Sequence, residues 1–106
     1  MINIADVKSE VESIKRQLLK KYKPEKIILF GSYAKGEFGQ NSDLDFLIVK
    51  NDSRRAIEIE QELHRIIDYR LASDFLFLSA DEFRKRLDEG DFFLKEIMTT
   101  GKIRYE

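Results

Sequence analysis

Two aspartates stand two positions apart in an otherwise apolar part of the chain. Asp43 and Asp45 belong to the run Asp-Leu-Asp-Phe-Leu-Ile-Val, which predicts a buried strand over residues 43–49. Positions i and i+2 of a strand point to the same side, about 6.5–7 Å apart. Two such carboxylates repel each other and resist burial. Mg²⁺ compensates them well, because it prefers carboxylate oxygens and keeps phosphate and water ligands, and two cations can share one cluster during a phosphoryl displacement.

The aspartate pair has a plain alternative, in which one carboxylate faces water at a strand end and the other caps a turn. Gly31 and Ser32 add a second feature, since they follow directly on the apolar run of residues 26–30. Where a strand meets a helix start, free backbone N–H groups and the helix dipole attract an anion. Glycine lets a phosphate approach the backbone closely, and the Ser32 hydroxyl can donate a further hydrogen bond. An ordinary glycine turn with a serine cap is the alternative here.

A third carboxylate, Asp74, interrupts the apolar run from Leu71 to Leu78, which predicts another strand. If this strand neighbours the strand of residues 43–49, Asp74 joins the same cluster. It would then ligate a metal and accept the proton of an incoming hydroxyl. The alternative is an aspartate in a solvated turn at the start of a strand.

These residues must be positioned by regular elements, which the apolar periodicity outlines. Helices are expected over residues 4–22 and 54–68, from the Ser79–Glu82 capping box to Gly90, and over about 91–99 with Phe93, Ile97 and Met98 buried. Strands are expected over residues 26–30, 43–49 and 71–78, with an edge strand at 102–105. Tyr33–Phe38 is expected to form one or two helical turns, Gly36, Gly39 and Asn41 a loop, and Asn51, Asp52 and Ser53 a turn with a helix N-cap. This order predicts one α/β (α+β) domain over residues 1–106, a small mixed sheet with helices packed mainly on one face.

The charge balance, the absence of Cys and the lack of long apolar runs exclude or disfavour several classes of protein. The 19 basic and 20 acidic residues leave a net charge of −1, whereas dedicated nucleic-acid-binding domains usually carry a positive excess. The sequence has no Cys, which excludes disulfides and Cys-based zinc sites. No apolar run approaches the roughly 18–20 residues that span a bilayer. We therefore expect a cytoplasmic protein without a membrane partner.

Taken together, the motifs resemble the DNA polymerase beta-like nucleotidyltransferase superfamily. Its pattern is Gly-Ser, ten residues, then Asp-x-Asp, with a third Asp on a later strand, as in Gly31-Ser32, Asp43-Leu44-Asp45 and Asp74 here. The stretches Gly-Ser-Tyr-Ala-Lys-Gly-Glu and Ser-Asp-Leu-Asp-Phe-Leu-Ile-Val are similar to the minimal (MNT) branch. The resemblance covers nearly the whole chain, and the spacing decides between the chemical interpretation of each motif and its alternative.

The resemblance implies a polymerase beta-like fold and a set of roles. Asp43 and Asp45 would hold two Mg²⁺ ions that bind a triphosphate, Asp74 would be the third ligand and the base, and Gly31 and Ser32 would bind the β- and γ-phosphates. Lys35 stands where the branch often has Arg; it keeps the charge but lacks the bidentate fork, so it is expected to be an auxiliary phosphate contact at best. The implied reaction transfers AMP from ATP to a hydroxyl.

The resemblance also implies a partner, since MNT proteins are commonly paired with HEPN toxins and can adenylylate a tyrosine on them as antitoxins. Two alternatives stay open: a binding module that neutralises its partner without catalysis, and a nucleotidyltransferase that modifies nucleic acid. A homo-oligomer is also compatible with the sequence. The sole histidine, His64, is interpreted as a solvated helix residue. The basic residues near two helices are interpreted as parts of solvated helix faces; they are Arg54, Arg55, Arg84, Lys85 and Arg86. Phe92 and Phe93 are interpreted as core residues, and one of the two is a candidate anchor for a partner.

Overall fold

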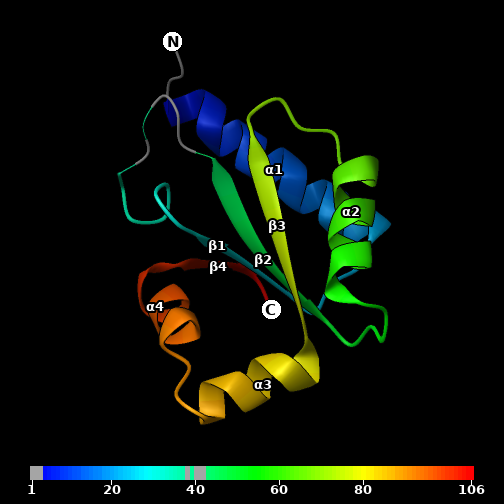
Figure 1. The fold of residues 1–106 in the computed structure, drawn as a ribbon. Helices are drawn as coiled ribbons and strands as arrows, with labels where there is room; N and C mark the ends of the chain where they lie inside the picture. Colours follow the sequence, from blue (N-terminus) through cyan, green and yellow to red (C-terminus); the bar gives the residue numbers. More distant parts are fainter. Residues whose placement is uncertain (1–3, 38, 40–42) are drawn as a thin grey trace.

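The computed structural model describes residues 4–37, 39 and 43–106, so the predicted loop residue Asn41 lies outside the described residues. In chain order the elements are α1 (Ile4–Lys21), β1 (Lys26–Phe30), β2 (Leu44–Lys50), α2 (Ala56–Ile66), β3 (Ser73–Ser79), α3 (Ala80–Asp88), α4 (Phe92–Thr100) and β4 (Lys102–Tyr105) (Figure 1). The predicted strands and long helices are confirmed, with ends that shift by one or two residues. No helix among the described residues is long and apolar enough to cross a membrane.

The four strands form one mixed sheet in the order β3-β2-β1-β4. Strand β1 runs antiparallel to both β2 and β4, whereas β2 and β3 are parallel. Parallel neighbours need a crossover connection, and α2 provides it. The register sets Asp45 opposite Phe30 on one side and opposite Asp74 on the other.

The two longest helices cover one face of the sheet and two shorter helices lie on the opposite face, so the helices are divided between both faces and not packed mainly on one (Figure 1). Alternate strand residues therefore enter two separate cores. The core under α1 and α2 includes Val11, Ile14, Leu18, Leu29, Phe46, Ile59, Leu63 and Phe75. The core under α3 and α4 includes Ile28, Leu47, Val49, Leu78, Phe83, Leu94 and Ile97.

Helices α3 and α4 cover only part of their face. Helix α4 packs against β1, and α3 lies at the end of β3 from which it begins (Figure 1). There Val49 and Leu78 are buried, but Asp45 is half-buried and Asp74 exposed at the opposite ends of the same two strands. This half of the sheet face is left open, and it carries the carboxylates.

The last helix differs from the sequence prediction in which side chains it buries. Leu94 and Ile97 are buried, whereas Phe92, Phe93 and Met98 are 82%, 43% and 38% exposed. The core interpretation of Phe92 and Phe93, and the burial of Met98, were therefore wrong. On so short a helix only the positions facing the sheet are covered, and here these are the two aliphatic residues three apart.

The start of α2 also differs from the prediction, because its N-cap is Arg55 and no side chain caps it. Ser53 is therefore not the cap. Asp52 instead accepts a hydrogen bond from the Arg54 backbone N–H at 3.1 Å, which closes a turn before the helix. The capping box of α3 is confirmed, since Ser79 accepts from the Glu82 N–H at 3.1 Å.

Candidate active site

The candidate site occupies the open half of the sheet face beside α4. Asp45 and Asp74 are register partners on the parallel strands β2 and β3, so their side chains leave the same face. Neighbouring strands lie about 4.8 Å apart, which sets the two carboxylates side by side. Asp43 lies exposed, immediately before β2 and two positions ahead of Asp45.

Gly31 follows directly on β1 and lies against the Asp45 carboxylate. Its φ of +78° lies in the left-handed region, and a Cβ added there would stand 2.2 Å from Asp45 Oδ2. Any side chain at this position would therefore meet both backbone strain and a steric clash. The turn at Gly31 and the Asp43–Asp45 motif are separate in the sequence, but Gly31 and Asp45 lie next to each other in the structure.

The segment after Gly31 is a series of turns. The Gly31 and Ser32 carbonyl groups accept hydrogen bonds from the N–H groups of Lys35 at 3.2 Å and Glu37 at 2.8 Å. The bond from Lys35 to Gly31 spans four positions and so closes one helical turn, but residues 32–37 form no continuous helix, and Phe38 lies outside the described residues. Without a helix here, attraction of an anion depends on the backbone N–H groups of a turn and not on a helix dipole.

The electrostatics of the site favour a cation. Burial, and then repulsion from Asp74 and Asp43, raise the pKa of Asp45 above its ordinary value. Within the described residues, no three His, Cys, Asp or Glu side chains are gathered as a ready cage for a metal. Mg²⁺ seldom uses such a cage; it binds through one or two carboxylates together with substrate phosphates. Asp45 and Asp74, with Asp43 beside them, fit that mode.

Comparison with known proteins agrees with this geometry. Residues 11–100 match the model of the family described as "Nucleotidyltransferase domain". The chain belongs to this nucleotidyltransferase family. A relative from Methanocaldococcus jannaschii, named as a candidate protein adenylyltransferase (MJ0604), is 32% identical over 81 residues, which cover 76% of this chain and 77% of the relative.

Solved structures share the fold of this nucleotidyltransferase at lower sequence identity. A candidate nucleotidyltransferase from Sulfolobus solfataricus matches with a TM-score of 0.57 at 18% identity, over 96% of this chain and 87% of that one. A mutant of the toxin–antitoxin pair MntA–HpeT aligns over 99% of this chain and 73% of that one, with a TM-score of 0.49 at 22% identity. The first match supports the polymerase beta-like fold predicted from the sequence.

Lys35 of the nucleotidyltransferase turns toward α4 and not toward the carboxylates. Its Nζ donates to Glu96 Oε1 at 2.9 Å, and this hydrogen bond raises the pKa of Lys35. The ion pair joins the glycine turn to α4 across 61 positions of sequence. A phosphate would have to compete with Glu96 for this ammonium group, and the auxiliary role of Lys35 stays a prediction.

His64 is the residue that sequence reasoning set aside and the structure brings to the site. Its Nε2 lies 4.0 Å from Asp74 Oδ1. No local signal in the sequence marked this residue, because its approach depends on α2 packing beside β3 as the crossover between two parallel strands. His64 is partly exposed on α2, as the solvated-helix interpretation expects, and it also approaches Asp74 and packs against aromatic rings.

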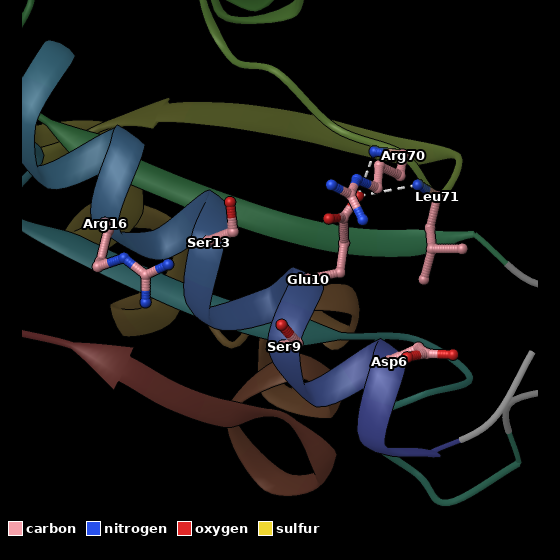
Figure 2. A pocket seen from close by; sticks show the side chains of 7 residues that line it. All are labelled: Asp6, Ser9, Glu10, Ser13, Arg16, Arg70 and Leu71. Carbon is pink, nitrogen blue, oxygen red and sulfur yellow. Dashed lines mark hydrogen bonds between the residues drawn. The ribbon is translucent and has the colours of Figure 1, made fainter.

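A cavity of about 510 Å³ lies elsewhere on the nucleotidyltransferase, along α1. It is lined by Asp6, Ser9, Glu10, Ser13, Arg16, Arg70 and Leu71, none of which was predicted to bind nucleotide. Figure 2 shows the Glu10 side chain reaching the loop before β3, where its Oε2 accepts from the N–H groups of Arg70 and, at 2.8 Å, Leu71. This buried carboxylate anchors the loop that leads to Asp74.

Proposed function

We propose that this nucleotidyltransferase transfers AMP from ATP to a hydroxyl of a protein, specifically a tyrosine of a HEPN-type partner, and thereby acts as an antitoxin. The observation that carries the proposal is the in-register pair of Asp45 and Asp74, with Asp45 pressed against the Gly31 backbone. The name of the M. jannaschii relative, a candidate protein adenylyltransferase, supports a protein as the acceptor.

The residues divide the work between the triphosphate and the acceptor. The turn at Gly31 and Ser32 would bind the β- and γ-phosphates with backbone N–H groups and the Ser32 hydroxyl. Asp43, Asp45 and Asp74 would hold the Mg²⁺ ions. When bound, Mg²⁺ supplies neutralisation of the negative charge that builds on the phosphoryl oxygens.

Asp74 is placed to receive the acceptor. Its side chain is 68% exposed, and it lies on β3, one of the two edge strands of the described sheet. The acceptor oxygen would attack the α-phosphorus, the bond from that phosphorus to the bridging oxygen would break, and pyrophosphate would leave. The acceptor proton would pass to Asp74. Positioning and charge neutralisation suffice for this displacement, so no covalent enzyme intermediate is needed.

The openness of the site favours a large acceptor. Asp45 is only half-buried and Asp74 is exposed, so a partner's surface can close over the nucleotide and exclude water. The net charge of −1 gives no general attraction for a nucleic-acid backbone, which disfavours RNA or DNA as the acceptor.

The test is transfer of label from ATP to a HEPN protein encoded beside this gene, in the presence of Mg²⁺. Label in the α-phosphate should reach a tyrosine of the partner, whereas label in the γ-phosphate should not, because it leaves in pyrophosphate. The double variant Asp43→Ala and Asp45→Ala should transfer neither. Equal labelling by wild type and double variant contradicts the proposal. Neutralisation of the toxin that survives the double variant would instead identify a binding module.

A further inference from the structure

We propose that His64, supported by Tyr69, is a positioning residue that orients the Asp74 carboxylate in the open half of the sheet face. The proposal rests on the function proposed above, because it assigns the role of His64 through Asp74. Its physical basis is a histidine ring fixed by its neighbours, with one nitrogen directed at the third carboxylate.

The His64 ring is held on two sides. Phe75 packs against it edge-on with ring centroids 4.9 Å apart, and Tyr69 does so at 5.8 Å. Tyr69 and Phe75 also meet each other at 6.1 Å, which closes a cluster of three rings. In addition, His64 Nδ1 lies 2.9 Å from the Tyr69 hydroxyl. A ring fixed by two aromatic contacts and a hydrogen bond has lost the freedom expected of a solvated helix residue.

The contact between His64 Nδ1 and the Tyr69 hydroxyl fits either tautomer of the ring, and the positioning role uses the one in which the hydroxyl donates. A neutral imidazole has one donor and one acceptor nitrogen. When the Tyr69 hydroxyl donates to Nδ1, the ring hydrogen is on Nε2, and Nε2 lies 4.0 Å from Asp74 Oδ1. A movement of about 1 Å would bring this pair to hydrogen-bond distance, and contacts of this kind often tighten when substrate binds.

Asp74 needs such support because of its place in the fold. It lies on the edge strand β3 with 68% of its side chain exposed, so packing does little to fix its carboxylate. An N–H group beside a carboxylate ligand typically fixes its orientation, and its loss costs about 10–100-fold in metal affinity or activity.

Docking of α2 does not depend on the His64 nitrogens. Ile59 and Leu63 are fully buried beneath the helix. Glu60 Oε2 also accepts a hydrogen bond from the Phe77 N–H on β3 at 2.9 Å. The Nε2 group can therefore be removed while these contacts hold the helix in place, which separates positioning from structural support.

Three variants test the proposal. His64→Leu removes both nitrogens, His64→Gln keeps a donor near the Nε2 position, and Tyr69→Phe keeps the ring cluster but removes the hydroxyl. The first readout is Mn²⁺ affinity, measured by calorimetry on the whole chain with a non-hydrolysable ATP analogue. The second is kcat and KM for ATP in the transfer assay.

His64→Leu should weaken Mn²⁺ binding and lower kcat by about 10–100-fold, with KM for ATP little changed, because the phosphate turn is untouched. His64→Gln should recover most of both losses, and Tyr69→Phe should fall between His64→Leu and wild type. Wild-type values for His64→Leu, or a loss with His64→Gln as large as with His64→Leu, would overturn the proposal.

The positioning role of His64 can still be tested if His64→Leu does not fold or if the wild-type protein shows no transfer. If His64→Leu does not fold, Tyr69→Phe carries the test, and wild-type Mn²⁺ affinity and kcat in that variant reject the positioning role. If the wild-type protein transfers nothing to any acceptor, the proposed function fails, yet the Mn²⁺ affinities still decide whether His64 supports Asp74.

Discussion

Replacement of Gly31 by alanine should separate catalysis from stability. The φ of +78° at Gly31 costs an L-residue roughly 1–2 kcal/mol. The new Cβ would also stand 2.2 Å from Asp45 Oδ2, so the carboxylate must move by about 1 Å to reach an ordinary contact. A displacement of about 1 Å at a reacting centre costs about 100-fold in rate. We therefore expect Gly31→Ala to lower kcat/KM by about 100-fold or more and stability by only about 1–2 kcal/mol.

Gly36→Ala is the matched control for this experiment. Gly36 lies in the same series of turns and has nearly the same φ, +76°, but an added Cβ meets nothing within 4 Å. Both variants should therefore lose similar stability in urea unfolding, while Gly36→Ala keeps most of its transfer activity with labelled ATP. If the two variants lose activity equally, backbone strain and not the displaced Asp45 explains the effect, and the reasoning is refuted.

Three other substitutions test the fold and the electrostatics. Tyr22→Phe removes the hydroxyl that donates to Asp52 Oδ2 at 2.9 Å, so it should cost about 1 kcal/mol, or about 4–8 °C in Tm, by calorimetry; a change under about 1 °C would contradict this. Gly101→Ala would place a Cβ 2.4 Å from the Ile97 carbonyl oxygen, and this backbone clash should destabilise by about 1–3 kcal/mol in urea unfolding; wild-type stability would show that the helix end can shift freely. Asp45→Asn should abolish transfer yet raise Tm at neutral pH without metal. The raised pKa of Asp45 means that the folded state holds its proton more tightly than the unfolded state, so wild-type stability falls as pH rises from about 4 through the folded pKa. The Asn variant should lack this decline, and an unchanged pH profile of Tm would contradict the electrostatic account.

Much of the fold could be predicted from the sequence because its signals are local. Short apolar runs bounded by Pro, Gly or polar residues identified the strands, and the Ser79–Glu82 spacing identified a real cap. The link between Gly31 and Asp45 was also predictable, because their spacing in the sequence matched a known pattern. What the structure adds is the reason for that spacing: the glycine backbone and the carboxylate touch.

Features that depend on tertiary packing were not predictable in the same way. Phe92 is a large apolar residue of the kind that usually lies in a core, but the short α4 buries only Leu94 and Ile97. His64 approaches Asp74 only because α2 packs beside the edge strand, and the order of strands in a sheet is not written in any one segment. The one or two helical turns expected after Gly31 are a series of turns instead, because local periodicity over so few residues discriminates poorly.

The most direct test of the central claim is Mg²⁺-dependent transfer of α-labelled AMP to the proposed HEPN-type partner by wild type and by Asp45→Asn. Asn has nearly the shape of Asp but cannot supply the negative charge, and the Asp45 site lies between Gly31 and Asp74. We predict labelling of a partner tyrosine by wild type, dependent on Mg²⁺, and none by Asp45→Asn although it folds. Labelling by Asp45→Asn at the wild-type rate would contradict the assignment of this open sheet face as the catalytic site.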